Sequence, residues 1–220
     1  MTTEQLASVF LDLQGKKAHN INLVTPTHYA DHIREALLLA KEQGLAIPVV
    51  YNCGGYEKAD TLKSLEGLID VYLTDFKYMD PELARTLSSA EDYPEIAKEA
   101  LAEMVRQQPV CLFDEDDMMT RGVIVRHLLL PGHVKEAEQM AEYLYRTYGD
   151  RICLSLMNQY TPVRRFEKYP FLNRKVTKRE YERLISFVLD LGVENAFIQE
   201  GETAEESFIP PFDLTGLEKY

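Results

Sequence analysis

Residues 71–77 read Val-Tyr-Leu-Thr-Asp-Phe-Lys, an apolar run that closes on polar side chains, and four other segments follow the same pattern. They are 21–28, 47–55, 123–132 and 152–159, and each ends in polar, Gly or Pro residues. A plausible helix follows each run. This alternation is typical of parallel strands that are buried on both faces and joined by helical crossovers. Such folds place their chemistry at the carboxyl ends of the strands, so the closing polar residues are the candidates for function.

The apolar spacing along the whole chain predicts six strands and seven helices. The strands are expected at 20–24, 47–51, 69–75, 122–130, 151–157 and 196–199. The helices are expected at 2–14, from His28 to Gly44, around 62–65, from Asp80, from Asp92 to about 107, at 134–147 and at 178–191. Asp80 and Asp92 each stand just before a Pro, which predicts an N-cap followed by Pro in the first turn. The acidic residues of 109–120 predict a loop. No linker or strong repeat divides the chain, so one domain over 1–220 is expected.

This alternation leaves two architectures open, a doubly wound open sheet and a barrel. Neither the GxGxxG fingerprint of dinucleotide-binding folds nor the GxxxxGK(S/T) phosphate loop occurs in the sequence. Nucleotide binding of those two kinds therefore lacks support. A full or partial barrel is favoured.

Composition excludes several classes of function. The chain has 220 residues and a net charge of −12, and that average field would repel a nucleic acid. No apolar segment is long enough to cross a membrane, and the first residues show no secretory signal. Cys53, Cys111 and Cys153 are odd in number and far apart, which argues against a disulfide framework. A cytoplasmic protein that binds neither nucleic acid nor membrane is expected.

Charged side chains at two strand ends are the first candidates for chemistry. Asp75 and Lys77 are two residues apart, so on a strand they point to the same face with Cα atoms about 7 Å apart. They would either position a zwitterionic ligand or form a structural ion pair. Arg126 lies in an apolar strand, where its guanidinium needs an anion. That anion would be a ligand carboxylate or phosphate, or a structural Asp or Glu.

Uncharged polar groups close the other strands. Thr25, Thr27 and the turn 52–55 supply hydroxyls, an amide and backbone N–H groups, which suit a ligand but are also ordinary turn residues. Two interpretations stay open for the segments 158–162 and 199–201: their polar residues contact the substrate, or they form ordinary loop structure. His28 and His32 are spaced for a metal, but without the Glu of an HExxH motif this signal is weak, and no metal ligands are assigned. Cys53 is interpreted as a small strand-end residue rather than a nucleophile.

Four of these stretches together resemble a known family. Segments 20–28, 50–57, 72–79 and 125–133 are similar to the radical SAM proteins, and most of all to an uncharacterised group related to pyruvate formate-lyase activating enzyme. The likeness continues through 154–160 to 208–212. It implies an α/β fold, a partial (β/α)6 TIM-like barrel of mostly parallel strands, that binds S-adenosylmethionine across its carboxyl-end rim.

The resemblance implies cofactor-binding roles for residues at the first two strand ends. Thr25 and Thr27 stand where many relatives have a Gly-Gly-Glu that binds the methionyl amino group of the cofactor. This sequence departs from that pattern. Asn52 matches the position that follows the third barrel strand.

Three later strand ends also match. Asp75 and Lys77 match the Asp-x-Lys that closes the fourth barrel strand, and they are also the candidate catalytic residues. Arg126 matches the Arg of the fifth strand, expected near the carboxylate or ribose of the cofactor. Asn158 and Gln159 fall at the sixth strand end, near adenine or substrate.

The main departure from the family concerns its iron–sulfur cluster. The family holds a [4Fe-4S] cluster with a CxxxCxxC motif after its first barrel strand, and this sequence has no such motif. Cys53, Cys111 and Cys153 cannot replace it by spacing. Met1 falls within the helix that follows that loop in the family, so the first strand is expected to be missing as well. Without it, the edge of the strand at 20–24 would be exposed.

These observations lead to one leading hypothesis and two alternatives. The leading one is a radical SAM protein that, in its complete form, uses the cluster and S-adenosylmethionine to generate a 5′-deoxyadenosyl radical. It would need an electron donor such as flavodoxin or ferredoxin, and its substrate could be a glycine on a partner protein. This chain alone is expected to be inactive. The alternatives are a barrel lyase or aldolase that uses Lys77 as a Schiff-base amine, and a degenerate barrel that only binds a ligand.

Overall fold

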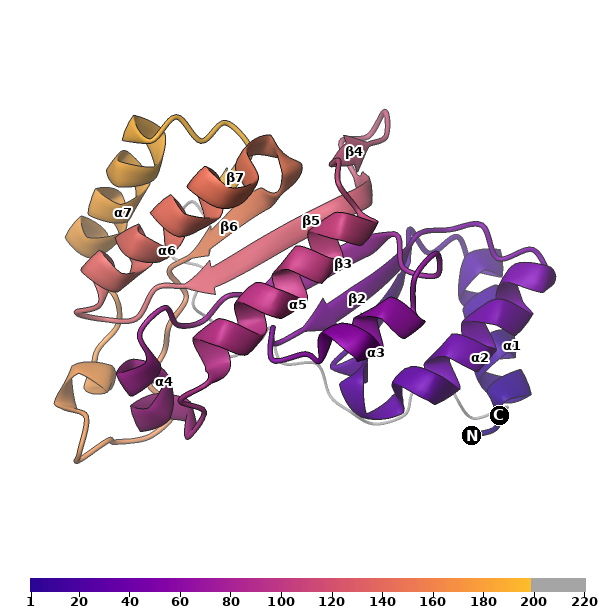
Figure 1. Ribbon diagram of the computed structural model, residues 1–220, viewed down its shortest axis with the longest axis horizontal. Helices are drawn as coiled ribbons and strands as arrows, with labels where there is room; N and C mark the ends of the chain where they lie inside the picture. The colour runs from indigo at the N-terminus through magenta and orange to yellow at the C-terminus, as the bar shows by residue number, and fades with distance from the viewer. Residues whose placement is uncertain (199–220) are drawn as a thin grey trace.

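The computed structural model describes residues 1–198 and contains one mostly parallel sheet of seven strands (Figure 1). Six parallel strands lie side by side in the order β1-β2-β3-β5-β6-β7, which is their order in the chain. Their bounds are Ile21–Val24, Val49–Cys53, Val71–Asp75, Met119–Leu128, Cys153–Met157 and Ala196–Ile198. The short strand β4, Leu112–Phe113, pairs antiparallel with the start of β5.

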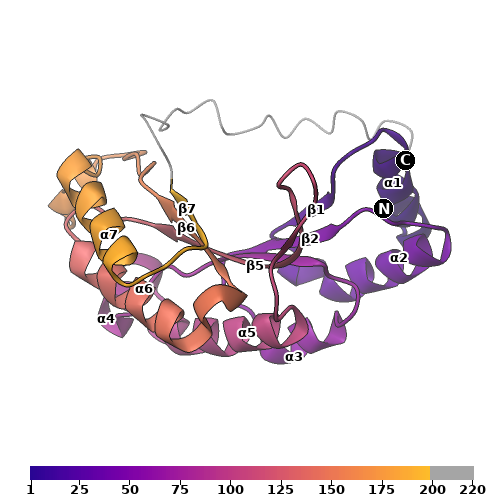
Figure 2. The same ribbon diagram turned by 90° about the horizontal axis from the view of Figure 1, so that it is seen from above.

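The helices cover only one face of this sheet. Figure 2 shows α2, α3, α5 and α6 in an arc along the outer side of the curved strands. The α-helices are α1 Thr3–Gly15, α2 Ala30–Glu42, α3 Ala59–Ser64, α4 Pro81–Ser88, α5 Tyr93–Gln107, α6 Val134–Tyr148 and α7 Lys178–Asp190. Short 3-10 helices are η1 Pro26–Tyr29, η2 Gly149–Arg151 and η3 Pro170–Asn173. Because every crossover between neighbouring parallel strands has the same hand, all helices return on one side and the sheet curls. The predicted α/β partial barrel is confirmed.

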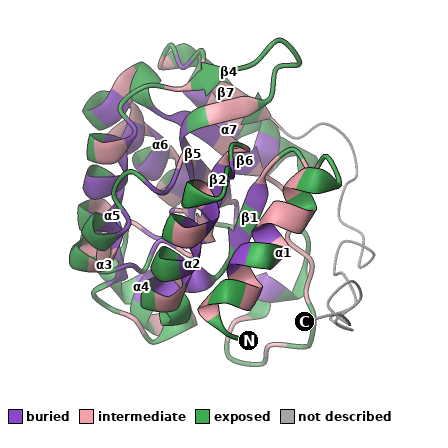
Figure 3. Ribbon diagram, turned by 90° about the vertical axis from the view of Figure 1, so that its right-hand side faces the viewer, coloured by how far each residue is buried: buried purple, intermediate pink, exposed green. Residues whose placement is uncertain are grey.

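The core lies between the strands and this layer of helices. Figure 3 shows buried residues on the strands and on the helix faces turned toward them, with exposed residues on the outer turns. Fully buried side chains at the centre are Leu37, Tyr51, Leu62, Leu65, Tyr72, Phe76, Leu101, Met104, Met140 and Leu144. A core of this size removes enough apolar area from water to offset the ordering of a domain of this length.

The opposite, concave face of the sheet is less buried than the sequence predicts. Leu73, Ile124 and Leu128 alternate with buried neighbours and are only partly covered. Their strands were expected to be buried on both faces. In a closed barrel, side chains from all strands fill the interior, whereas a partial barrel has fewer strands to supply them. Among residues 1–198, no helix covers the concave face beside the carboxyl-end rim.

Side-chain caps begin three of the described α-helices, α1, α4 and α7. Asp80 caps α4 as predicted, because its carboxylate accepts the Glu82 N–H at 2.9 Å. Asp92 precedes α5, but its side chain makes no cap and instead accepts the Tyr56 hydroxyl at 2.7 Å. Asp92 is thus the N-cap residue with Pro94 in the first turn, as expected, but without a side-chain capping bond, and the helix starts and ends where expected.

Two other expectations need correction. The predicted loop at 109–120 contains a hairpin, because Asp114 closes a tight turn by accepting the N–H groups of Asp116 and Met118. The helix expected from His28 begins as the 3-10 turn η1 before α2. The segments 199–201 and 208–212 lie outside the described residues. Within 1–198, no helix combines the length and apolarity that a membrane crossing requires.

Candidate functional site at the carboxyl-end rim

Three neighbouring strands bring Asn52, Asp75 and Arg126 into one hydrogen-bonded network. Asp75 of β3 and Arg126 of β5 are register partners, and the Arg126 Nε–H donates to Asp75 Oδ1 at 2.8 Å. The Arg126 Nη2 donates to Asn52 Oδ1 of β2, also at 2.8 Å. The Asp75 and Arg126 side chains are 23% and 25% exposed, so both are partly desolvated. The candidate residues of these three strands are thus adjacent.

Lys77 extends this network toward a small cavity. Its Nζ lies 3.7 Å from Asp75 Oδ2, and its side chain is 47% exposed. The cavity beside it has a volume of about 240 Å³. It is lined by Asp75, Lys77, Tyr78, Leu128, Leu130 and Met157. One end is therefore charged and the other is apolar, which suits a ligand with an ionic head and an apolar or aromatic body.

The turn after β2 packs directly over this network, and only glycine fits there. Gly55 has φ +81°, and a Cβ at this position would lie 2.2 Å from the Asp75 carbonyl oxygen. Gly54 lies beside the Lys77 side chain, where a Cβ would be 3.7 Å from Nζ. Glycine at 55 therefore lets the backbone after β2 approach the backbone carbonyl that ends β3, whereas a Cβ at 54 would make only an ordinary contact.

Tyr93 fixes this turn, although its sequence context predicted no functional role for it. Its hydroxyl lies 2.9 Å from the Gly54 carbonyl and 3.2 Å from the Asp75 carbonyl, and it accepts the Lys77 N–H at 3.0 Å. Burial raises the pKa of Tyr93 above its ordinary value, so the hydroxyl keeps its proton and can donate. Its position at the start of α5 concealed this role, because contacts with strand ends far away in the sequence decide it.

Glu57 is a second residue that sequence reasoning missed. Its carboxylate is 4% exposed and accepts the Thr27 hydroxyl at 2.8 Å and the Tyr51 hydroxyl at 3.0 Å. Burial raises the pKa of Glu57, and the two hydroxyl donors only partly counteract it. Glu57 therefore ties η1 to β2 behind the rim.

Thr25 and Thr27 follow the edge strand β1 but do not join the Arg126 network. Thr25 has φ 52°, a left-handed conformation, and its N–H donates to the Asn52 carbonyl at 2.8 Å. The Thr27 hydroxyl donates to Glu57. The Thr25 backbone therefore supports the end of β2 at Asn52, and the Thr27 side chain supports Glu57.

Asn158 and Gln159 follow β6 directly and so lie at the same edge of the sheet. Gln159 Nε2 is 3.7 Å from the Met157 sulfur, and Met157 lines the cavity beside Lys77. The loop after β3 is held from behind by Glu136, which accepts the Met79 and Asp80 N–H groups. Burial raises the pKa of Glu136.

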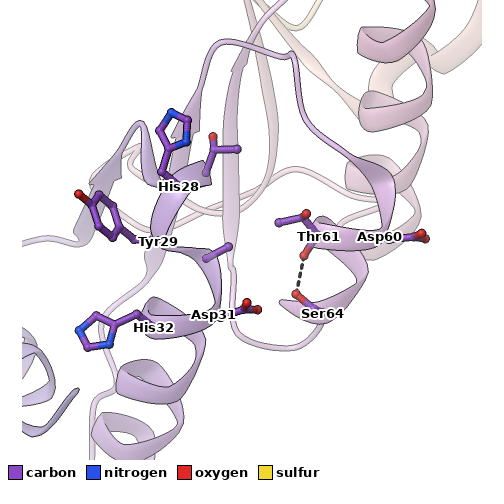
Figure 4. A pocket seen from close by; sticks show the side chains of 9 residues that line it. His28, Tyr29, Asp31, His32, Asp60, Thr61 and Ser64 are labelled. Atoms are coloured by element: carbon purple, nitrogen blue, oxygen red, sulfur yellow. Dashed lines mark hydrogen bonds between the residues drawn. The ribbon is translucent and has the colours of Figure 1, made fainter. Parts of the chain in front are cut away.

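A more open pocket lies beside η1 rather than on the concave face. Its volume is about 500 Å³, and it is formed by residues 27–32 and by Asp60, Thr61 and Ser64 (Figure 4). Figure 4 shows the imidazoles of His28 and His32 pointing to different sides. Within residues 1–198, no three His, Cys, Asp or Glu side chains form a group that could hold a metal ion. Because this pocket has no converging charges, we place the candidate site at the rim.

The cysteines do not fit the cluster that the family resemblance implies. Cys53 is buried against Thr74, with its sulfur 3.5 Å from the hydroxyl oxygen. Cys111 and Cys153 lie at the amino ends of their strands, far along the fold from the rim. An iron–sulfur cluster requires several thiolates that converge on it. These three thiols therefore do not provide a cluster site.

Comparison with known proteins supports the fold. No protein-family model matches the chain. A crystal structure of a domain of pyruvate-formate lyase-activating enzyme from Bacteroides vulgatus superimposes with a TM-score of 0.56 and 14% identity, covering 82% of this chain and 98% of that one. An uncharacterised protein of Methanocaldococcus jannaschii is 31% identical over 140 residues, which is 63% of this chain. The matched stretch spans 37% of that relative's length. The chain therefore shares the fold of an activating-enzyme domain.

Proposed function

We propose that this chain is a domain of the radical SAM type and that its carboxyl-end rim binds S-adenosylmethionine. The observation that carries the proposal is the network of Asn52, Asp75 and Arg126 beside Lys77, at the edge of a parallel sheet where such folds bind ligands. The likeness to an activating-enzyme domain supports the same assignment through the fold.

The charges at the rim suit this ligand. S-adenosylmethionine carries a carboxylate, an ammonium group, a sulfonium and a ribose with two hydroxyls. Arg126 and Lys77 offer cationic donors for the carboxylate or ribose, and Asp75 offers an acceptor for the ammonium or ribose. The apolar wall that includes Leu128 and Met157 suits an adenine ring. Asn158 and Gln159 follow β6 beside Met157 and would contact adenine or substrate.

The proposal limits this chain to binding. Reductive cleavage of S-adenosylmethionine needs a cluster, and the cysteines of this chain do not provide one. In the complete protein, we expect a segment with CxxxCxxC to supply the cluster, and an electron donor and a protein substrate to take part. The concave face beside the rim is where such a substrate would approach.

Lys77 is a poor candidate for a Schiff-base amine. Lysines with that role lie in an apolar pocket or beside another cation. The Lys77 side chain is instead 47% exposed, and the charge nearest to it is the Asp75 carboxylate. We therefore favour ligand binding over the lyase alternative.

Binding is tested by NMR titration of the full chain with S-adenosylmethionine, because shift changes detect affinities into the millimolar range. We expect saturable shifts for the Arg126 side-chain N–H and for the amides after β3 and β6. Arg126→Ala should weaken binding about tenfold or more, since it removes a charge-assisted donor pair. Arg121→Ala, on the same strand but at its exposed amino end, is the matched control. No saturable shift in the wild-type protein, or equal losses in both variants, would contradict the proposal.

A further inference from the structure

Cys111 and Cys153 lie together although 41 other residues separate them in the sequence. Cys111 comes just before β4, and Cys153 is the first residue of β6. The Cys111 sulfur lies 3.6 Å from the carbonyl oxygen of Arg151, two residues before Cys153, so the two cysteines are neighbours in the fold. Cys111 is half-buried and Cys153 is buried. The pair lies at the amino end of the strands, opposite the rim, so its chemistry is independent of the proposed cofactor site.

Contacts of the Cys111 sulfur and Cα with other residues also place Cys111 beside the start of β6. Its sulfur lies 3.6 Å from the Arg151 carbonyl, two residues before Cys153, and 3.9 Å from the Val123 carbonyl. A Cβ on Gly122 would be 2.9 Å from the Cys111 Cα and 3.0 Å from its sulfur. Glycine at 122 therefore lets the chain segment before β4 lie flat against β5, next to the start of β6.

Cys153 also lines a pocket that is large enough for part of a small molecule. A pocket of about 280 Å³ lies between the hairpin and the segment before β7. Its lining is Phe113, Asp117, Cys153, Glu194, Asn195, Ala196 and Phe197. The buried thiol is thus reached from one side by this pocket, while Cys111 is reached from the solvent.

We propose that Cys111 and Cys153 form a dithiol site that converts reversibly to a disulfide by exchange with a small disulfide of the glutathione type. The Cys111 thiolate attacks one sulfur of the small disulfide, which forms a mixed disulfide and releases one small thiolate. The Cys153 thiol then loses its proton and attacks the Cys111 sulfur, which closes the protein disulfide and releases the second thiolate. The protein loses two electrons and two protons, and the small disulfide is reduced to two thiols.

The ionisation of the two thiols fits these roles. Hydrogen bonding from Cys153 lowers the pKa of Cys111 to about 6, so Cys111 is the attacking thiolate at neutral pH. The same hydrogen bond raises the pKa of Cys153, which keeps its proton until Cys111 has reacted. Burial raises the pKa of Cys53 to about 12, so the third cysteine serves as an internal control that should not react.

The disulfide would fasten the hairpin to the sheet. In the reduced protein, β4 is held by a two-residue antiparallel ladder beside β5, and the hairpin projects beyond the end of the sheet (Figure 1). A covalent link from Cys111 to Cys153 would tie the base of this hairpin to β6. We expect the oxidised protein to melt at a higher temperature, because the link restricts the unfolded chain.

The test uses the full chain, reduced and then incubated with oxidised glutathione at neutral pH. Free thiols are alkylated, and the protein is analysed by intact mass and by peptide mapping without reduction. With the alkylation done in denaturant after the oxidation, we expect the loss of two hydrogens, a peptide linking Cys111 with Cys153, and an alkylated Cys53, which shows that Cys53 was still a free thiol. A stable glutathione adduct on wild-type Cys111, or all three thiols still free, would overturn the proposal.

Two variants separate the first step, in which Cys111 attacks the small disulfide, from the second step, in which Cys153 closes the protein disulfide. Cys153→Ser should accumulate the glutathione adduct on Cys111, because the second thiol is absent. Cys111→Ser should leave Cys153 free. Circular dichroism and the melting temperature of both reduced variants check that each is folded. Reaction of Cys153 at the wild-type rate in Cys111→Ser would overturn the assigned order.

Discussion

Asp75 and Arg126 are register partners on neighbouring parallel strands, and the carboxylate of one accepts the Nε–H of the other at 2.8 Å. The sequence left open whether Arg126 meets a ligand anion or a structural carboxylate. In the structure, Arg126 meets Asp75, and the Asn52 side-chain oxygen accepts the Nη2 donor. A ligand anion at this rim would therefore bind to an arginine that is already oriented.

Asp75→Asn should destabilise the protein by about 1–2 kcal/mol, because Arg126 stays partly buried without its anion. The double variant Asp75→Asn with Arg126→Gln should be more stable than the sum of the two single losses predicts. The difference, about 1 kcal/mol, is the coupling between the pair. Urea unfolding of the four proteins measures it. Additive losses would show that the ion pair makes no contribution to stability.

Gly55→Ala should be much more disruptive than Gly67→Ala. Both glycines have a positive φ, +81° and +79°, but a Cβ at 55 would lie 2.2 Å from the Asp75 carbonyl, whereas nothing lies within 4 Å at 67. We expect a loss of about 1 kcal/mol at 67 from backbone strain alone. At 55 we expect about 3 kcal/mol or more, since the turn must also move. Equal losses at the two positions would show that the contact with Asp75 does not matter.

Tyr93→Phe should cost about 1–3 kcal/mol, because it leaves the Lys77 N–H and the Gly54 carbonyl without their partner in a buried place. Tyr56→Phe is the matched control. Tyr56 stacks on Tyr93 at 5.9 Å, is 45% exposed, and its hydroxyl contacts only Asp92 near the surface. We expect its loss to be below about 0.5 kcal/mol. Thermal unfolding of the two variants decides, and a larger loss for Tyr56→Phe would be inconsistent with the role given to Tyr93.

Glu57→Gln should change how stability depends on pH. The folded-state pKa of Glu57 is raised above its ordinary value of 4.5 by burial, so folding favours the protonated form. Its contribution to stability is then fully present at low pH and declines as the pH rises through the raised pKa. Gln cannot ionise and can still bond both hydroxyls. The variant should therefore gain stability relative to wild type as the pH rises above about 4.5, the ordinary value of this carboxyl.

Glu180→Gln should change the pH dependence of stability in the opposite direction, and the same measurement detects it. Arg174 lowers the pKa of Glu180, together with the Thr177 and Gly132 N–H groups. A lowered pKa gives stability that is present at neutral pH and is lost as the pH falls. The free energy of unfolding of the wild type should thus exceed that of this variant by most at neutral pH and by least in acid. Denaturant midpoints across pH give both curves, and parallel curves for Glu57→Gln and wild type would contradict the raised pKa.

The fold could be predicted from the sequence because its strands and helices are strongly patterned locally. Strand ends are neighbours in a parallel sheet, so Asn52, Asp75 and Arg126 could be placed together from their positions in the chain alone. The concave face could not be judged in this way. Leu73 and Ile124 are apolar whether or not a second layer covers them, and only the number of strands around the curve decides their burial.

The supporting residues escaped prediction for a different reason. Glu57 and Tyr93 act through hydroxyl, carboxylate and carbonyl groups that come from separate elements. Nothing in their immediate neighbours signals those partners. One signal was available for the turn, because two adjacent glycines directly after an apolar strand often mark a close approach of backbone. Cys111 and Cys153 likewise come together only because the chain forms the hairpin. The acidic composition of 109–120 predicted a loop there and gave no sign of the hairpin.

The order of the parallel strands in space repeats their order in the chain. Each new strand therefore needs only the strand synthesised just before it, and no strand must wait for a distant partner. A nascent chain leaving the ribosome could add β2 to β1, then β3, then β5, with each helix closing over the pair already made. Growth of the sheet thus leaves every earlier pair of parallel strands complete at each strand boundary.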